Sequence, residues 1–150
     1  CSKKMRKRRI DFLEKGSIAS FFLVLFLGCQ SQEEIRYEQY MVNGEELYVT
    51  HCANCHQKEG TGFKNVIPPL VNTDYLNADN KNRVICLIKN GIKEPLVVNG
   101  QTYTQAMPAN KQLQPIDIAA ITTYIYSKWG GERVRTDVVE VGKVLQACEE

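Results

Sequence analysis

The sequence predicts a mainly helical, all-α domain with long loops and at most one small hairpin. Three segments, residues 44–56, 80–91 and 115–130, carry apolar side chains at helical spacing. Residues 57–72 hold two glycines and two adjacent prolines, which predict a loop. Residues 96–103 carry a hairpin signal, because Asn99-Gly100 separates two short β-prone runs. A chain of 150 residues is long enough for one such domain.

The first two helices have recognisable ends. Residues 44–56 read GEELYVTHCANCH, with two glutamates in the first turn, where the helix dipole favours negative charge. The apolar stripe of this helix is formed by Leu47, Tyr48 and Cys52. The helix over 80–91 ends at Gly91, which suits the position after a helix C-terminus. Its apolar face is formed by Val84, Leu87 and Ile88.

The last long helix begins at Pro115, a residue that suits the first helical position, and ends at Gly130. Its apolar residues Ile118, Ile121, Ile125 and Trp129 recur at helical spacing. Residues 131–150 form a C-terminal extension. We predict a short helix there, because Asp137 and Glu140 resemble a capping box before an apolar run.

The N-terminal segment predicts export. The basic run KKMRKRR precedes an apolar run from Ile18 to Gly28, which is too short to span a bilayer but suits a signal peptide. Cys29 follows Gly28 as in a bacterial lipoprotein box, although Phe26 departs from the usual leucine. We therefore expect residues 1–28 to be a lipoprotein-type signal peptide, Cys29 to be lipidated, and residues 29–42 to form a flexible tether. The alternatives are cleavage elsewhere or a short uncleaved anchor.

Charge and cysteine usage limit the function further. Beyond residue 28 the chain has 12 basic and 15 acidic residues, so nothing in the charge favours nucleic-acid binding. Export would place the domain in an oxidising compartment, where Cys86 and Cys148 could form a disulfide. The alternative, which we favour, is that Cys86 is a small buried apolar residue and Cys148 is a thiol in a frayed tail.

Cys52, Cys55 and His56 form the motif that carries chemistry. A Cys-x-x-Cys pair suits a redox dithiol, half of a zinc site, a local disulfide or a c-type haem attachment. A zinc site needs four ligands, and the pair with His56 supplies three. A thioredoxin-like dithiol would follow a strand in an α/β domain, whereas this segment is helical. Two thiols on one turn can each bind a haem vinyl group, and the histidine that follows can ligate the iron.

Met107 is the candidate for the second axial iron ligand. It lies in a polar loop and is followed by Pro108. Met5 falls in the targeting segment, and Met41 falls in the expected tether and would have to fold back. His51 is a weaker candidate, because it shares a helix with His56 and reaches the opposite face poorly. The remaining alternative is an open iron site, which would suit a haem enzyme or gas sensor.

These features together resemble class I c-type cytochromes, of the small bacterial monohaem kind. The resemblance covers residues 43 to about 130. It rests on Gly44, Tyr48, CANCH at 52–56, Gly60, Gly62, PPL at 68–70, NG at 99–100, Tyr103, MPAN at 107–110 and the helix IAAITTYIYSKWG.

The resemblance implies an all-α cytochrome c fold over 43–130, with three to four main helices around one covalent haem c. Cys52 and Cys55 would attach the haem, and His56 and Met107 would be the axial iron ligands. A carbonyl of the Pro68-Pro69 turn would accept a hydrogen bond from His56; we assign the cofactor contact to Pro69 and a second contact, near a propionate, to Tyr103. Gly44 and Tyr48 would meet the last long helix at Tyr124 or Trp129.

The expected function follows from a filled coordination sphere, because a substrate has no vacant iron position to reach. We expect a monomeric electron carrier rather than an enzyme, exchanging single electrons with redox protein partners. It would be held by a lipid on the periplasmic side of a bacterial membrane. The alternatives are an electron-transfer subunit of a membrane or periplasmic dehydrogenase or reductase, a five-coordinate haem enzyme or gas sensor, and a non-haem lipoprotein with a Cys52–Cys55 disulfide.

Overall fold

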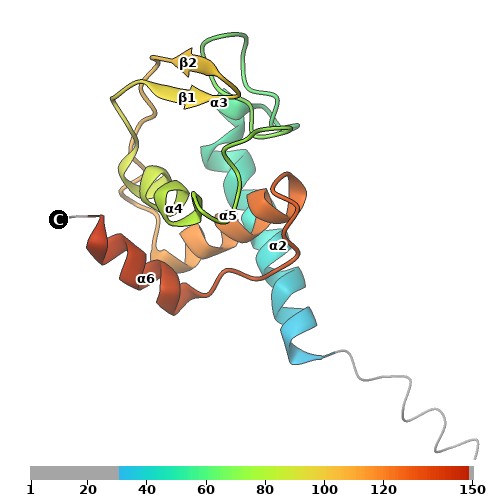
Figure 1. Ribbon diagram of the computed structural model, residues 1–150. Helices are drawn as coiled ribbons and strands as arrows, with labels where there is room; N and C mark the ends of the chain where they lie inside the picture. The colour runs from blue at the N-terminus through green and yellow to red at the C-terminus, as the bar shows by residue number, and fades with distance from the viewer. Residues whose placement is uncertain (1–30, 149–150) are drawn as a thin grey trace, which may run out of the picture. The chain divides into compact units, whose positions relative to one another are not determined.

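The computed structural model describes residues 31–148, and Figure 1 shows the arrangement of their helices and strands. The elements in chain order are α2 (Gln32–His51), α3 (Ala53–His56), α4 (Lys81–Asn90), β1 (Leu96–Val98), β2 (Gln101–Tyr103), α5 (Pro115–Lys128) and α6 (Val138–Ala147). The predicted fold class, mostly helical with one small antiparallel hairpin, is confirmed. The packing described below is that of the compact unit from Ile35 onward.

Helices α2 and α5 cross at a glycine. A Cβ atom on Gly44 would lie 2.8 Å from the side chain of Tyr124 and would overlap the backbone of Ala120, so only glycine allows this approach. One turn further along α2, the Tyr48 ring lies 5.5 Å from Tyr124 and 5.2 Å from Trp129, between ring centres. The contact expected for Gly44 and Tyr48 with this helix is therefore present.

The segment predicted to be a flexible tether is helical from Gln32 onward, because α2 begins there and continues to His51. Two cation–aromatic contacts hold its first turns against the C-terminal extension. The guanidinium of Arg133 lies 4.8 Å from the Tyr37 ring, and that of Arg135 lies 5.2 Å from the Tyr40 ring. The sequence pattern missed these first turns of α2, because the residues that contact them lie almost a hundred residues away.

The C-terminal extension contains the predicted short helix, α6, which packs on α4 and α5. The carboxylate of Asp137 caps it by accepting hydrogen bonds from the backbone N–H groups of Val139 and Glu140. A disulfide joins Cys86 on α4 to Cys148, with a Cα–Cα distance of 5.8 Å. Our preferred interpretation of two separate thiols was therefore wrong, because α6 folds back along α4 instead of fraying.

The hairpin is closed by the predicted two-residue turn. Both Asn99 and Gly100 have positive φ angles, 51° and 74°, as a tight turn between twisted strands requires. The Asn99 side chain accepts a hydrogen bond from the Asp74 backbone, and the Asp74 carboxylate accepts one from the Asn99 N–H, each at 2.8 Å. These bonds fix the hairpin over the loop that precedes α4.

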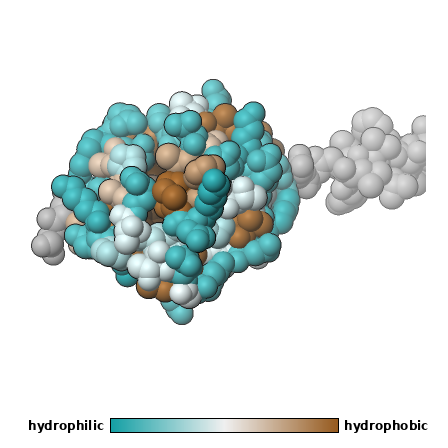
Figure 2. Space-filling model, turned by 90° about the horizontal axis from the view of Figure 1, so that it is seen from above, coloured by the Kyte–Doolittle hydropathy of each residue, from teal (hydrophilic) through white to brown (hydrophobic). Residues whose placement is uncertain are grey.

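The hydrophobic core surrounds α5, whose residues from Ile118 to Tyr126 are all buried. Val84, Ile85 and Ile88 of α4 and Val141 of α6 join this core. No helix within residues 31–148 combines the length and the hydrophobicity needed to cross a membrane. Seen from above, hydrophobic side chains lie at the centre of one face and hydrophilic side chains surround them (Figure 2).

Candidate cofactor site

Cys52, Cys55 and His56 lie on one helical turn, directly after α2. Cys52 continues the backbone bonding of α2 through its N–H to the carbonyl of Tyr48, at 2.8 Å. The N–H groups of Cys55 and His56 both donate to the carbonyl of Cys52, at 3.1 and 2.9 Å, which closes the short helix α3. Both cysteines are free thiols in this structure, so they do not form a local disulfide. Burial, with a smaller contribution from Cys55, raises the pKa of Cys52 to about 12.

One hydrogen bond fixes the imidazole of His56. Its Nδ1 lies 3.1 Å from the carbonyl oxygen of Pro68. A carbonyl only accepts, so Nδ1 carries the proton and Nε2 keeps its lone pair for a metal. The acceptor is the carbonyl of Pro68; the sequence had left open which proline of the 68–69 turn would supply it. Burial lowers the pKa of His56 although this hydrogen bond opposes the change, and the neutral ring is the form that ligates metals.

Glycine places the Pro68 carbonyl against His56. Gly62 has a φ angle of +66°, and a Cβ atom there would lie 2.7 Å from the carbonyl carbon and oxygen of Pro68. The Gly62 N–H also donates to the carbonyl of His56, at 3.0 Å. The loop thus folds back on α3 only because residue 62 has no side chain.

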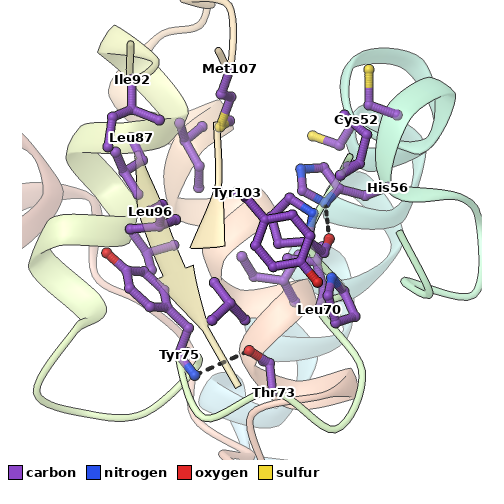
Figure 3. Close-up of a pocket in the computed structure, with 18 of the residues that line it drawn as sticks. Cys52, His56, Leu70, Thr73, Tyr75, Leu87, Ile92, Leu96, Tyr103 and Met107 are labelled. Atoms are coloured by element: carbon purple, nitrogen blue, oxygen red, sulfur yellow. Dashed lines mark hydrogen bonds between the residues drawn. The ribbon is translucent and has the colours of Figure 1, made fainter. Parts of the chain in front are cut away.

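Met107 is held against the end of α4 by a short bridge. Its backbone N–H and carbonyl exchange hydrogen bonds with Ile92, at 2.9 and 3.0 Å. Gly91 lies beneath this bridge, where a Cβ atom would be 2.8 Å from the backbone of Pro108 and Ala109 and would overlap the Met107 carbonyl. Figure 3 shows Met107 and His56 entering the pocket from different walls, His56 from α3 and Met107 from the segment after β2.

The pocket gathers six predicted cofactor residues, namely Cys52, Cys55, His56, Pro69, Tyr103 and Met107. Cys29 lies outside the described residues. Apolar side chains from the loop, from α4, from the hairpin and from α5 form most of the remaining wall: Ile67, Leu70, Leu76, Val84, Leu87, Ile88, Ile92, Leu96, Val98, Ile121 and Ile125. His51 does not line the pocket.

Sequence reasoning missed four polar residues of the wall: Thr73, Tyr75, Glu94 and Gln105. Thr73 and Tyr75 lie in the loop before α4, which has no helical or strand periodicity, and its attachment to the hairpin through Asp74 is seen only in three dimensions. A tyrosine in such a loop carries no sequence signal that separates a pocket residue from a surface one.

The donor set fits a haem. Two thiols on one turn, an imidazole with its Nε2 lone pair available and a thioether surround an apolar pocket, and the buried hydroxyl of Tyr75 has no hydrogen-bond partner there. Within residues 31–148, no group of three or more His, Cys, Asp or Glu side chains could hold a bare metal ion. Two thiols and an imidazole at the edge of an apolar pocket suit a macrocyclic cofactor.

Comparison with known proteins decides the family. The family model described as Cytochrome c matches residues 41–129, more than half of the chain. The chain belongs to the cytochrome c family. Its cofactor is therefore a covalently bound haem c, and the protein is an electron carrier.

Two kinds of relative are similar to this cytochrome. The first is Cytochrome c-552 of Thermus thermophilus, 30% identical over 91 residues, which are 59% of this chain and 69% of that protein. The second is the cytochrome c subunit of alcohol dehydrogenase (quinone) from Gluconacetobacter polyoxogenes, 30% identical over 92 residues, 61% of this chain and 19% of the subunit. The fructose dehydrogenase cytochrome subunit of Gluconobacter japonicus is 29% identical over 106 residues, 68% of this chain and 22% of that subunit. The match to the dehydrogenase subunits thus spans only about a fifth of their length.

Proposed function

We propose that this cytochrome is a membrane-tethered carrier of single electrons with a six-coordinate haem. Cys52 and Cys55 would hold the haem through two thioether bonds, and His56 Nε2 and Met107 Sδ would ligate its iron. The observation that carries this proposal is that His56 and Met107 line one apolar pocket. The Nδ1 atom of His56 is hydrogen-bonded to the Pro68 carbonyl, and the backbone of Met107 is hydrogen-bonded to Ile92. When bound, the haem supplies a one-electron iron couple.

The protein side chains set the properties of that couple. The soft thioether of Met107 favours ferrous iron and raises the reduction potential. The apolar wall, including Leu70, Val84 and Ile88, excludes water and disfavours the more highly charged ferric form. The Pro68 carbonyl keeps His56 in the tautomer that ligates through Nε2. Each of these residues acts on the equilibrium of electron transfer, and none provides a place for a substrate to bind iron.

Replacing Met107 with alanine tests the axial ligand. We expect Met107→Ala to keep the covalent haem, to lose the far-red sulfur-to-iron absorption of the oxidised protein, to bind cyanide readily and to have a lower reduction potential. Met41→Ala is the matched control, because Met41 does not line the pocket. It should match the wild type in haem content, far-red absorption, cyanide binding and reduction potential. An oxidised wild-type spectrum with high-spin, five-coordinate iron would refute the proposal and favour a haem enzyme or gas sensor.

The tether belongs to the same proposal. The basic run, the apolar run and Cys29 support export and lipidation, and the Cys86–Cys148 disulfide suits an oxidising compartment such as the periplasm. Lipidation at Cys29 would leave the mature domain on the periplasmic side of a bacterial membrane. We expect Cys29→Ser to move the haem-containing protein from the membrane fraction to the soluble fraction. If the distribution does not change, Cys29 is not the anchor.

A stable subunit is the alternative to a free carrier. The relatives named as cytochrome subunits of dehydrogenases favour it, although the match spans only about a fifth of their length. Purification from the native membrane in mild detergent separates the two. A single haem-containing band at the mass of one chain supports a free carrier, whereas a constant ratio to a larger dehydrogenase or reductase chain supports the subunit.

A further inference from the structure

The segment from Ile92 to Met107 forms a flap along one wall of the cofactor pocket. Its middle is the hairpin of β1 and β2, with three residues in each strand. Leu96, Val98 and Tyr103 of this hairpin line the pocket, and Figure 3 labels the first and the last of them. A two-stranded hairpin is marginally stable at best on its own. The position of the flap therefore depends on its attachments to the rest of the domain.

The first attachment is the bridge at the base of the flap. There the backbone N–H and carbonyl of Met107 exchange hydrogen bonds with Ile92, at 2.9 and 3.0 Å. Met107 follows the end of β2, at Tyr103, by only four positions. A movement of the hairpin about its base therefore acts directly on the segment that carries the proposed axial ligand.

The second attachment is at the tip of the flap, where three hydrogen bonds join Asn99 to the loop before α4. The side-chain oxygen of Asn99 accepts from the Asp74 N–H, and the Asp74 carboxylate accepts from the Asn99 N–H, each at 2.8 Å. The side-chain amide of Asn99 also donates to the carbonyl of Asn72, at 2.9 Å. Asn99 thus uses its backbone N–H, its side-chain oxygen and its side-chain amide in a single contact.

The backbone on both sides of this contact is shaped for it, and the contact is open to water. Asn99 and Asn72 have φ angles of 51° and 52°, in the left-handed region that asparagine adopts more readily than most residues. Both asparagines and Asp74 are exposed. Hydrogen bonds exposed to solvent open more readily than those of a buried core. The tip can therefore open while the core of the domain stays folded.

We propose that Asp74, Asn99 and Asn72 form a latch whose closure keeps Met107 on the haem iron. While the latch is closed, the flap stays against the pocket and the Met107 segment keeps its place. When the latch opens, the flap swings about the bridge to Ile92, and Met107 is released with it. The three latch residues are positioning residues, since none of them lines the pocket. This inference rests on the proposed axial ligation by Met107.

Cyanide binding to the oxidised full-length holoprotein tests the latch. Cyanide needs a vacant iron position, so at saturating cyanide the binding rate equals the rate at which Met107 leaves. We expect Asp74→Ala to raise this limiting rate by about tenfold, because the closed state loses a charge-assisted hydrogen bond. Asn99→Asp should raise it as well, because a second carboxylate replaces the amide that donates to Asn72. Asp74→Asn should stay near the wild-type rate, because its side-chain oxygen still accepts from the Asn99 N–H.

Hydrogen exchange gives a second readout that does not depend on the iron. In the same holoproteins, the backbone amides of residues 96–103 should exchange faster in Asp74→Ala than in the wild type. The amides of α5 should keep their wild-type protection, because the latch opens without unfolding the core. An equal loss of protection in the hairpin and in α5 would show general destabilisation and would overturn the inference.

Asp79→Ala is the matched control, because Asp79 is an exposed aspartate of the same loop and takes no part in the three bonds to Asn99. It should keep the wild-type cyanide rate and hairpin protection. Wild-type rates in both Asp74→Ala and Asn99→Asp, or an equal increase in Asp79→Ala, would contradict the latch. An oxidised wild-type protein without the far-red sulfur-to-iron absorption refutes the proposed ligation by Met107. A wild-type protein with that absorption, and unchanged rates in the latch variants, refutes this inference alone.

Discussion

If Met107 ligates the haem iron as proposed, replacing Gly91 with alanine should detach Met107 without removing the haem. Gly91 has φ 68° and ψ −169°, a backbone conformation that is essentially restricted to glycine. A Cβ atom there would also meet the backbone of Met107, Pro108 and Ala109. These neighbours are main-chain atoms, so no side-chain rotation relieves the overlap. The segment that carries Met107 must move.

The cost has two parts. Holding alanine in this conformation costs about 1–3 kcal/mol, and overpacking against fixed atoms adds about 1–3 kcal/mol. Gly100 provides the matched control, because its φ angle is similar, +74°, and nothing lies within 4 Å of a Cβ atom there. Gly100→Ala should therefore show only the conformational cost, about 1–2 kcal/mol, which corresponds to roughly 4–8 °C in the melting temperature.

Two measurements on the holoprotein separate these outcomes. Thermal unfolding gives the stability of each variant, and the far-red sulfur-to-iron absorption reports Met107 ligation directly. We expect Gly91→Ala to lose more stability than Gly100→Ala and, unlike it, to lose the absorption. Full Met107 ligation in Gly91→Ala, with a loss of stability no larger than in the control, would show that the close packing beneath Met107 does not hold the ligand.

Three further predictions concern the scaffold. Gly44→Ala should destabilise the domain by about 1–3 kcal/mol through overpacking at the helix crossing, whereas Gly142→Ala, in open space on α6, should stabilise it by about 0.5–1 kcal/mol; denaturant titration measures both. Replacing Cys86 and Cys148 with serine should cost up to about 4 kcal/mol, because the bond closes a loop with a sequence separation of 62 residues; a change below 1 kcal/mol would show that the disulfide adds little. Backbone N–H groups lower the pKa of Asp137, so its stabilisation is present above the ordinary aspartate pKa of about 3.9 and is lost as the pH falls below it. The free energy of unfolding should therefore fall less steeply between about pH 5 and pH 3 in Asp137→Asn than in the wild type.

Local signals in the sequence were sufficient for most of the fold. Asn99-Gly100 specified a two-residue turn by its φ requirements, Pro115 fixed the start of α5, and Asp137 fixed the start of α6. The Cys-x-x-Cys-His spacing placed two thiols and an imidazole on one turn, because that geometry is local to a helix. Features of this kind depend on neighbours only a few residues away.

Features that depend on distant partners were missed. The first turns of α2 are polar and gave no apolar stripe, and their contacts with Arg133 and Arg135 cannot be read from the helix itself. The Cys86–Cys148 pair depends on the direction in which α6 returns along α4. The sequence left open which proline of the 68–69 turn bonds to His56, because the answer depends on how Gly62 turns the loop.

The four cysteines of the domain must reach two different chemical states during maturation. Cys86 and Cys148 must be oxidised to each other, whereas Cys52 and Cys55 must stay reduced until they meet the haem. A disulfide between Cys52 and Cys55 would close the shortest loop of any pair among the four cysteines, so its formation would have the lowest entropic cost. This pair also precedes Cys148 in the chain, so it emerges earlier during synthesis. Maturation must therefore keep Cys52 and Cys55 reduced, or reduce them again, while Cys86 and Cys148 are oxidised to a disulfide. If Cys52 and Cys55 form a disulfide first and it is not reduced, the chain cannot attach haem.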